Sequence, residues 1–224
     1  MKHIITKEFI LSSYFEKIMM AHTENDDLFN NADTKSYQYR HTELTGFGAW
    51  RWLAIYQNRH LIADYIFSDK IGIDWGGYAG PIYGNSIIVD MNTDYKGPHS
   101  LKSCGAQSQD YIFSSNTLEH VDDVLKTLQE MHGLLRNYGK IIILVPSWTN
   151  HRWRKKHHRA HKHTFCLEGD ENAGNEGEVF TTIEPLVREA KFTIKKCGYS
   201  WENGIFIFAE REFDRILAKK NDNR

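Results

Sequence analysis

A glycine-rich turn and a nearby acid are the residues best suited to hold a ligand. The members of the turn are Asp74, Gly76, Gly77 and Gly80, and the acid is Asp90. Because glycine has no side chain, such a turn after a strand lets the backbone approach a ligand closely. An acid that ends the next strand can accept hydrogen bonds from both hydroxyls of a ribose. The turn alone is also typical of an ordinary strand-to-helix connection, but together with Asp90 it predicts a nucleoside site.

A second segment, residues 110–121, joins an apolar strand pattern to the polar residues Asn116, Glu119 and His120. A helix pattern follows it, and then residues 140–145 form a β-branched run that is typical of a central strand. Glu119 and His120 can cap the following helix, because an acid there favours the helix dipole. This role and a role beside a ligand both stay open.

Five histidines and six lysines or arginines lie between Asn150 and His163. They are compatible with a solvated surface loop, partly balanced by Glu168, Asp170, Glu171, Glu176 and Glu178. They are also compatible with a surface for an anionic acceptor, because Arg and Lys pair well with phosphate. A metal site with His161 and His163 is a third interpretation, but the six cations oppose a divalent ion. We therefore predict no metal ligands, and the first two interpretations stay open.

The glycine-rich turn resembles that of the class I methyltransferases that use S-adenosylmethionine (SAM), specifically the type 11 methyltransferase family. The family carries an acid-x-Gly-x-Gly-x-Gly turn after its first strand. Asp74, Gly76 and Gly80 match this pattern, whereas Tyr78 replaces the middle glycine and Gly77 stands one place earlier. The interval from Gly80 to Ser86 is too short for a full crossover helix, so the first βαβ unit must be abbreviated.

The match of residues 110–121 is longer, because it resembles the family's fourth strand and its Leu-Glu-His signature. A helix and a fifth strand that ends in Pro146 follow, as in the family. The last part of the chain has the pattern of a strand, a turn with glycine and a second strand. This pattern resembles the antiparallel end of the methyltransferase sheet. The resemblance covers residues 60–150 well and residues 180–212 weakly.

The resemblance implies SAM as the cofactor and assigns residues to it. The methionine part would lie among Asp74, Gly76, Gly77 and Gly80, the ribose would bind Asp90, and Met91 would flank the adenine. Asn116, Leu118 and His120 would lie near the reactive methyl group. Methyl transfer needs mainly alignment and the exclusion of water, but a hydroxyl acceptor also needs a base, for which histidine is suited. His163 or His161 is the predicted base, and His120 is a further catalytic candidate.

The methyl acceptor is defined less well than the cofactor. The basic loop, and a general likeness to methyltransferases of polysaccharide gene clusters, favour a small-molecule or glycan acceptor that bears phosphate, as in polysaccharide biosynthesis. Trp148 and Trp153 can stack on bases, so RNA is an alternative, which the near-zero charge disfavours. A second alternative is a nucleotide-binding or regulatory module that lost catalysis. It is favoured by Tyr78, which replaces the middle glycine of the turn. An NAD-dependent oxidoreductase would not explain residues 116–120.

Positioning these residues requires an α/β fold with a parallel sheet. Strands are predicted at residues 70–74, 86–90, 110–114, 140–145, 192–197 and 204–208, and helices at residues 6–21, 47–67, 120–137 and 183–191. This alternation predicts a Rossmann-like, doubly wound, mostly parallel sheet with an antiparallel terminal strand and an N-terminal helical extension.

The predicted organisation is an N-terminal helical arm or lid at residues 1–46, a methyltransferase domain at 47–214, and a tail at 215–224. Residues 148–179 form a loop insertion in that domain. The 224 residues carry a formal charge of −1, which gives no overall attraction to nucleic acid or an anionic membrane. Three distant cysteines, no signal peptide and no membrane span predict a cytoplasmic protein. The oligomeric state stays open.

Overall fold

The computed structural model describes residues 7–16, 57–66, 70–77, 86–91, 94–150, 154–156, 159–170, 178–200 and 204–212. Its strands are β1 (Gly72–Trp75), β2 (Ser86–Val89), β3 (Gln109–Ser115), β4 (Leu135–Pro146), β5 (Phe165–Cys166), β6 (Thr181–Thr182), β7 (Phe192–Ser200) and β8 (Gly204–Arg211). Its helices are α1 (Lys7–Ile10), α5 (Arg59–Ile66), α6 (Val124–Leu134) and α7 (Ile183–Glu189), with 3-10 turns η2 (Leu101–Ser103) and η3 (Leu118–His120).

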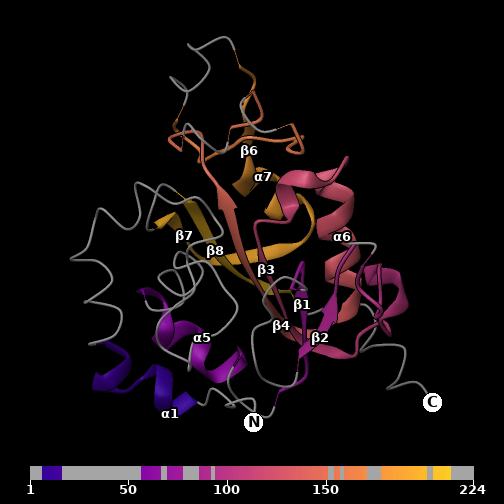
Figure 1. Ribbon diagram of the computed structural model, residues 1–224, viewed down its shortest axis with the longest axis vertical. Coiled ribbons are helices and arrows are strands. Elements are labelled where there is room, and N and C mark those ends of the chain that lie inside the picture. The colour runs from indigo at the N-terminus through magenta and orange to yellow at the C-terminus, as the bar shows by residue number, and fades with distance from the viewer. Residues whose placement is uncertain are drawn as a thin grey trace.

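Six strands form one sheet in the order β2-β1-β3-β4-β8-β7 (Figure 1). The first four run parallel, and β8 pairs antiparallel with both β4 and β7. Trp75, the last residue of β1, is in register with Val89 of β2 and Ser114 of β3, so these strands end at one common edge. The topology confirms the expected Rossmann-like, mostly parallel sheet with an antiparallel end.

Helices cover both faces of this sheet (Figure 1). On one face α6 and α7 bury a large apolar cluster, to which alternate residues of the strands contribute, such as Ile141 and Ile143 of β4. On the other face α5 buries Ile62, Ala63 and Ile66. Alternate residues of a strand point to opposite faces of the sheet. The central strands therefore contribute apolar side chains to both layers, as expected for strands that are buried on both sides.

The helix predicted at residues 120–137 is shorter in the structure. It begins at Val124, because the Asp123 side chain accepts a hydrogen bond from the backbone N–H of Lys126 (2.9 Å) and caps it. It ends at Leu134, and β4 starts at once with Leu135 paired to Gln109. The residues around 137–139, where the predicted helix would end, instead form a bulge within β4.

The predicted N-terminal helices are described only in part. Within residues 7–16 the helix breaks after Ile10, and the Ser12 hydroxyl accepts a hydrogen bond from the N–H of Phe15 (3.1 Å) to start another turn. Residues 57–66 contain α5, as predicted. The rest of the predicted arm at residues 17–46, the abbreviated crossover after Gly80 and the tail lie outside the described residues.

The predicted insertion at residues 148–179 contains a strand as well as loops. β5 pairs parallel with β6, and the N–H of Trp148 donates to the carbonyl of Phe165 (2.8 Å), so this segment folds back onto the end of β4. α7 then follows β6 directly, as predicted, and leads to the terminal β7–β8 pair. Among the described helices, none is long and apolar enough to cross a membrane.

Candidate functional site

The predicted cofactor residues lie at the carboxyl edge of the parallel strands. Gly76 follows β1, Asp90 follows β2 and Asn116 follows β3. The strand order changes direction between β1 and β3, because β2 lies on one side of β1 and β3 on the other. Ligands of doubly wound sheets bind outside the carboxyl ends of the strands at such a reversal. The glycine turn and Asn116 flank this point directly.

The turn after β1 requires glycine at Gly76. Its φ angle is +79°, which L side chains rarely adopt, and a Cβ atom there would lie 1.9 Å from the Thr117 hydroxyl oxygen. Thr117 is buried and donates its hydroxyl to the carbonyl of Trp75 (3.3 Å). Thr117 therefore joins the ends of β1 and β3, a role that the sequence analysis missed because nothing in the residue type marks it.

Gly77 and Asp74 lie against each other at the same turn. The Asp74 side chain is fully buried, and a Cβ atom at Gly77 would lie 2.5 Å from its carboxyl carbon. Glycine at this position thus lets the backbone pass over the carboxylate. Gly80, the last glycine of the predicted turn, lies outside the described residues.

Asp90 is held by its backbone at the end of β2. Its N–H donates to the carbonyl of Pro98 (3.0 Å), and its carbonyl accepts from Nδ1 of His99 (2.9 Å). Its side chain is half-buried, and the neighbouring Met91 is 56% exposed. An acid at the end of the second strand is expected to bind a ribose, and for Asp90 this role stays a prediction.

The residues after β3 differ in where their side chains lie. Asn116 has a φ angle of +52° and donates its N–H to the carbonyl of Leu144 (2.9 Å). Leu118 is fully buried in the apolar cluster under α6, so its side chain packs in the core. Its cofactor contact stays a prediction.

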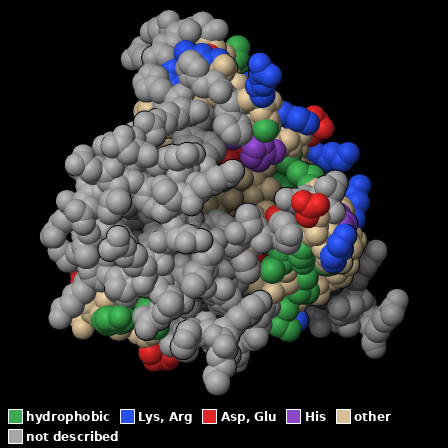
Figure 2. Space-filling model, viewed as in Figure 1, with side chains coloured by type: hydrophobic (Ala, Val, Ile, Leu, Met, Phe, Trp, Pro, Cys, Tyr) green, Lys and Arg blue, Asp and Glu red, His purple; other side chains and the backbone are tan. Residues whose placement is uncertain are grey.

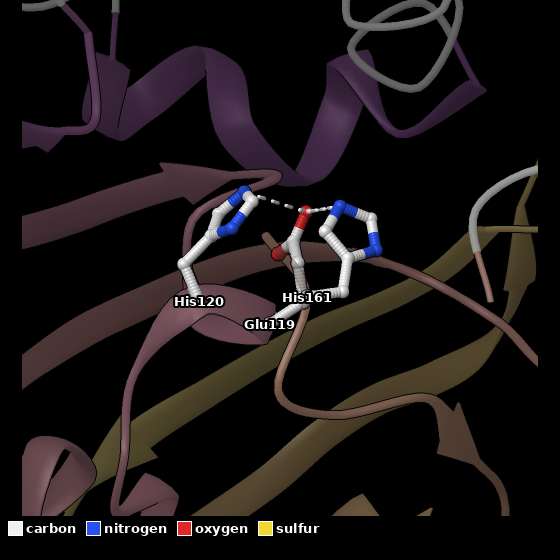
Figure 3. A group of neighbouring side chains, drawn as sticks. All are labelled: Glu119, His120 and His161. Carbon is white, nitrogen blue, oxygen red and sulfur yellow. Dashed lines mark ion pairs between the residues drawn. The ribbon is translucent and has the colours of Figure 1, made fainter. Parts of the chain in front are cut away.

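Glu119, His120 and His161 form a compact group beyond the end of β3 (Figure 3). Glu119 and His120 belong to η3, and His161 comes from the loop after β4, whose Lys162 N–H donates to the Glu119 carbonyl (2.8 Å). The Glu119 Oε1 atom lies 3.9 Å from Nε2 of His120 and 4.0 Å from Nε2 of His161. Figure 3 shows the carboxylate between the two imidazole rings.

Burial dominates the electrostatics of this group. The side chains of Glu119 and His161 are 0% exposed, whereas that of His120 is 31% exposed. Burial raises the pKa of Glu119 to about 8, so this carboxyl group holds its proton at neutral pH unless a cation replaces it. His120 donates from Nδ1 to the Ala160 carbonyl (2.9 Å), which leaves its Nε2 lone pair on the side of Glu119.

His163, the other predicted base, is bound in a different way. Its Nε2 donates to the Val121 carbonyl (3.0 Å), and its Nδ1 lies 3.2 Å from the hydroxyl of Thr181. Both ring nitrogens are thus used within the protein. The structure brings His120 and His161 together with Glu119, and it places His163 in a structural role between η3 and β6.

The basic loop is partly structural and partly solvent-exposed. Arg154 is fully buried, and its guanidinium donates to the Trp148 carbonyl and lies against the rings of Trp148 and Phe180. Trp148 also donates its indole N–H to Asp170 (3.2 Å). The exposed cations among the described residues of this loop are Lys155, Lys156, Arg159 and Lys162.

Two of the acids expected to balance this loop, Glu168 and Glu178, have other partners in the described part of the chain. Glu168 pairs with Arg188 of α7 (2.8 Å), and Glu178 accepts a hydrogen bond from Thr164 (2.8 Å). Lys162 pairs with Asp122 instead. Figure 2 shows Lys and Arg side chains along the upper right border of the molecule, beside a hollow with a histidine at its edge. Trp153, His151, His157 and His158 lie outside the described residues.

A cavity of about 250 Å³ lies between the start of α5 and the β7–β8 pair. It is lined by Gln57, Asn58, Lys196, Gly198, Tyr199 and Phe206. None of the predicted cofactor or catalytic residues belongs to this lining, so we do not assign it to the site at the carboxyl edge.

Comparison with known proteins gives a match over part of the chain and a set of solved structures of low identity. A search of curated proteins found no match. Among solved structures, a SAM-dependent methyltransferase from Mesorhizobium loti is 11% identical, with 70% of this chain and 98% of that chain covered and a TM-score of 0.47. One from Methanosarcina mazei is 14% identical, with 69% and 98% covered and a TM-score of 0.48.

The family model of the methyltransferase domain matches residues 98–143. This range contains β3, η3, α6 and most of β4, and therefore the Leu-Glu-His segment that resembled the family in sequence. The match supports SAM as the cofactor. Over residues 98–143 the chain is similar to a methyltransferase domain, in agreement with the resemblance seen in the sequence.

Proposed function

We propose that the protein is a SAM-dependent methyltransferase that binds the cofactor between the ends of β1 and β3. The observation that carries this proposal is the coincidence of two features. The segment that matches the methyltransferase domain contains β3, and β3 ends at the point where the strand order reverses. The glycine turn and Asp90 stand at the same edge, where they would hold the methionine part and the ribose.

The acceptor is a hydroxyl group of a polar, anionic molecule such as a phosphate-bearing glycan precursor. Four exposed cations, Lys155, Lys156, Arg159 and Lys162, lie in the loop that also carries His161. These side chains would pair with phosphate. The group of Glu119, His120 and His161 would assist the removal of the proton from the acceptor hydroxyl. The acceptor oxygen then attacks the methyl carbon, and the electrons of the carbon–sulfur bond return to sulfur.

Calorimetric titration with SAM, its demethylated product and NAD tests the cofactor. We expect SAM or the product to bind with a Kd on the order of 1 μM, about −8 kcal/mol, and NAD not to bind. Asp90→Ala should weaken the binding of SAM by about 100-fold, because two ribose hydroxyls lose their hydrogen-bond acceptor. Glu189→Ala, an exposed acid at the end of α7, is the control and should bind like wild type.

Absence of SAM binding in wild type would remove the catalytic function and favour a binding module that lost it. Once SAM binds, nucleotide sugars, lipid-linked glycans and RNA are incubated with SAM labelled in its methyl group. Label in a glycan or nucleotide sugar supports the acceptor class, and label in RNA alone contradicts it.

A further inference from the structure

We propose that Glu119, His120 and His161 form a binding site for a divalent transition-metal ion. The ligand atoms are a carboxylate oxygen of Glu119 and one nitrogen of each imidazole, and all three lie within 4.8 Å of one another. Because Nδ1 of His120 donates to Ala160, Nε2 is the ligand atom of that ring. The carboxylate lies between the two rings in Figure 3, as a shared site requires.

The donor set selects the class of metal. Two imidazoles and one carboxylate suit zinc, iron and similar ions of intermediate softness better than magnesium or calcium, which prefer oxygen ligands. Ligand atoms about 2.1 Å from a metal lie roughly 3–4 Å from each other. The distances of 3.9 and 4.0 Å from Glu119 to the two rings are therefore already near those of an occupied site.

Glu119 supplies an independent indication of a ligand. Its side chain is 0% exposed, yet neither carboxylate oxygen accepts a hydrogen bond from another side chain or backbone group in the described part of the chain. Buried carboxyl groups are normally hydrogen-bonded, paired or coordinated to a metal. The alternative role as a helix cap does not apply, since Asp123 caps α6.

The described ion-pair contacts of Glu119 are with the two histidines and not with the cations of the loop. Glu119 lies beside His120 and His161, and Lys162, the neighbour of His161, is paired with Asp122. The objection that the sequence raises against a divalent ion in this loop is therefore met by the geometry at Glu119. His163 is not a ligand, because its ring binds Val121 and Thr181.

Three protein ligands leave a position for water or substrate. A consequence that rests on the proposed function is that the acceptor hydroxyl occupies this position. The metal lowers the pKa of the hydroxyl, which releases its proton to water. The oxygen lone pair then forms the bond to the methyl carbon as the carbon–sulfur bond breaks toward sulfur.

Titration of the full chain with Zn²⁺ alone, after treatment with a chelator, tests the site without SAM. We expect one tight site, and weaker binding of Mg²⁺. Glu119→Gln and His161→Ala should each weaken the tight site by about 100-fold, since even outer-shell changes cost 10–100-fold. His60→Ala, an exposed histidine on α5, is the control and should leave it unchanged.

Substitution with Co²⁺ gives a second measurement, because its visible absorption reports the ligands directly. The spectrum should change in His120→Ala but not in His60→Ala. Glu119→Gln retains the size of the buried side chain, and its far-ultraviolet circular dichroism shows whether it is folded. Zn²⁺ that fails to bind wild type, or that binds Glu119→Gln as tightly, overturns the proposal, while SAM titration of the same samples reports separately on the cofactor.

Discussion

Contacts between single side chains and the backbone set the shape of the cofactor edge. Gly76 is the clearest case, because its positive φ and its distance to Thr117 both exclude a side chain. Thr117 in turn places its hydroxyl within hydrogen-bond distance of the carbonyls of Trp75 and Ser115, at the paired ends of β1 and β3.

Gly76→Ala should destabilise the protein by about 3 kcal/mol, through the left-handed backbone and the contact with Thr117, and weaken SAM binding. Gly133→Ala is the matched control, because Gly133 is exposed within α6 and nothing lies within 4 Å of an added Cβ. It should stabilise by about 0.5–1 kcal/mol as alanine favours the helix. Urea denaturation measures both, and equal effects of the two variants would contradict this role of Gly76.

At the scale of elements, strands were easier to predict than the ends of helices. The apolar runs located β1, β3, β4 and β8, because long stretches of these strands are buried on both faces. The run at β2 was located by its apolar residues although this strand is only partly buried. The helix at residues 120–137 was predicted too long, since its apolar spacing continues on both sides of the cap at Asp123. The two-residue β5 was missed because its partner, Thr181, lies far along the chain.

The candidate site could be predicted only where its residues directly follow predicted strands. The glycine turn, Asp90 and Asn116 follow strands, so the pattern of elements brings them to one edge. The pairing of Glu119 with His161 depends on how the loop after β4 folds back, which no local pattern records. The adjacent Glu119 and His120 after a strand were the available signal, but they fit a helix cap equally well.

The loop after β4 is anchored through Asp170. Its carboxylate accepts hydrogen bonds from Trp148 (3.2 Å), from the N–H of Leu167 (3.0 Å) and from the hydroxyl of Tyr199 on β7. Burial raises the pKa of Asp170, but these hydrogen bonds, that from Tyr199 foremost, lower it by more, so it lies below 3.8. The ionised form therefore ties the loop to the terminal strands.

Asp170→Asn should lower the free energy of unfolding by about 1 kcal/mol at pH 7, because the group is partly exposed and solvent screens it. A folded pKa below the unfolded value gives stability that is present above about pH 4 and is lost as the pH falls through the folded pKa. The difference from wild type should thus vanish at low pH, whereas Glu189→Gln should show no such dependence. A difference that persists at about pH 2 would contradict the anchoring role.

At the scale of the whole molecule, the proposed cofactor and metal residues share one edge of the sheet without sharing side chains. The cofactor group consists of residues after β1, β2 and β3, and the metal group of η3 and the loop after β4. The formal charge of −1 makes the basic loop a local feature of that edge. Both ligands would bind the folded chain alone, so each should stabilise it through mass action.

Thermal unfolding with each ligand and with both together tests this arrangement. At 100 times its Kd, a ligand adds about 2.7 kcal/mol, which corresponds to a rise in Tm of roughly 5–10 °C for a chain of this size. We expect the SAM and Zn²⁺ shifts to add in wild type, because they use different side chains. Asp90→Ala should lose the SAM shift alone and Glu119→Gln the Zn²⁺ shift alone. Shifts that exclude each other would mean that both ligands compete for one site at the end of β3.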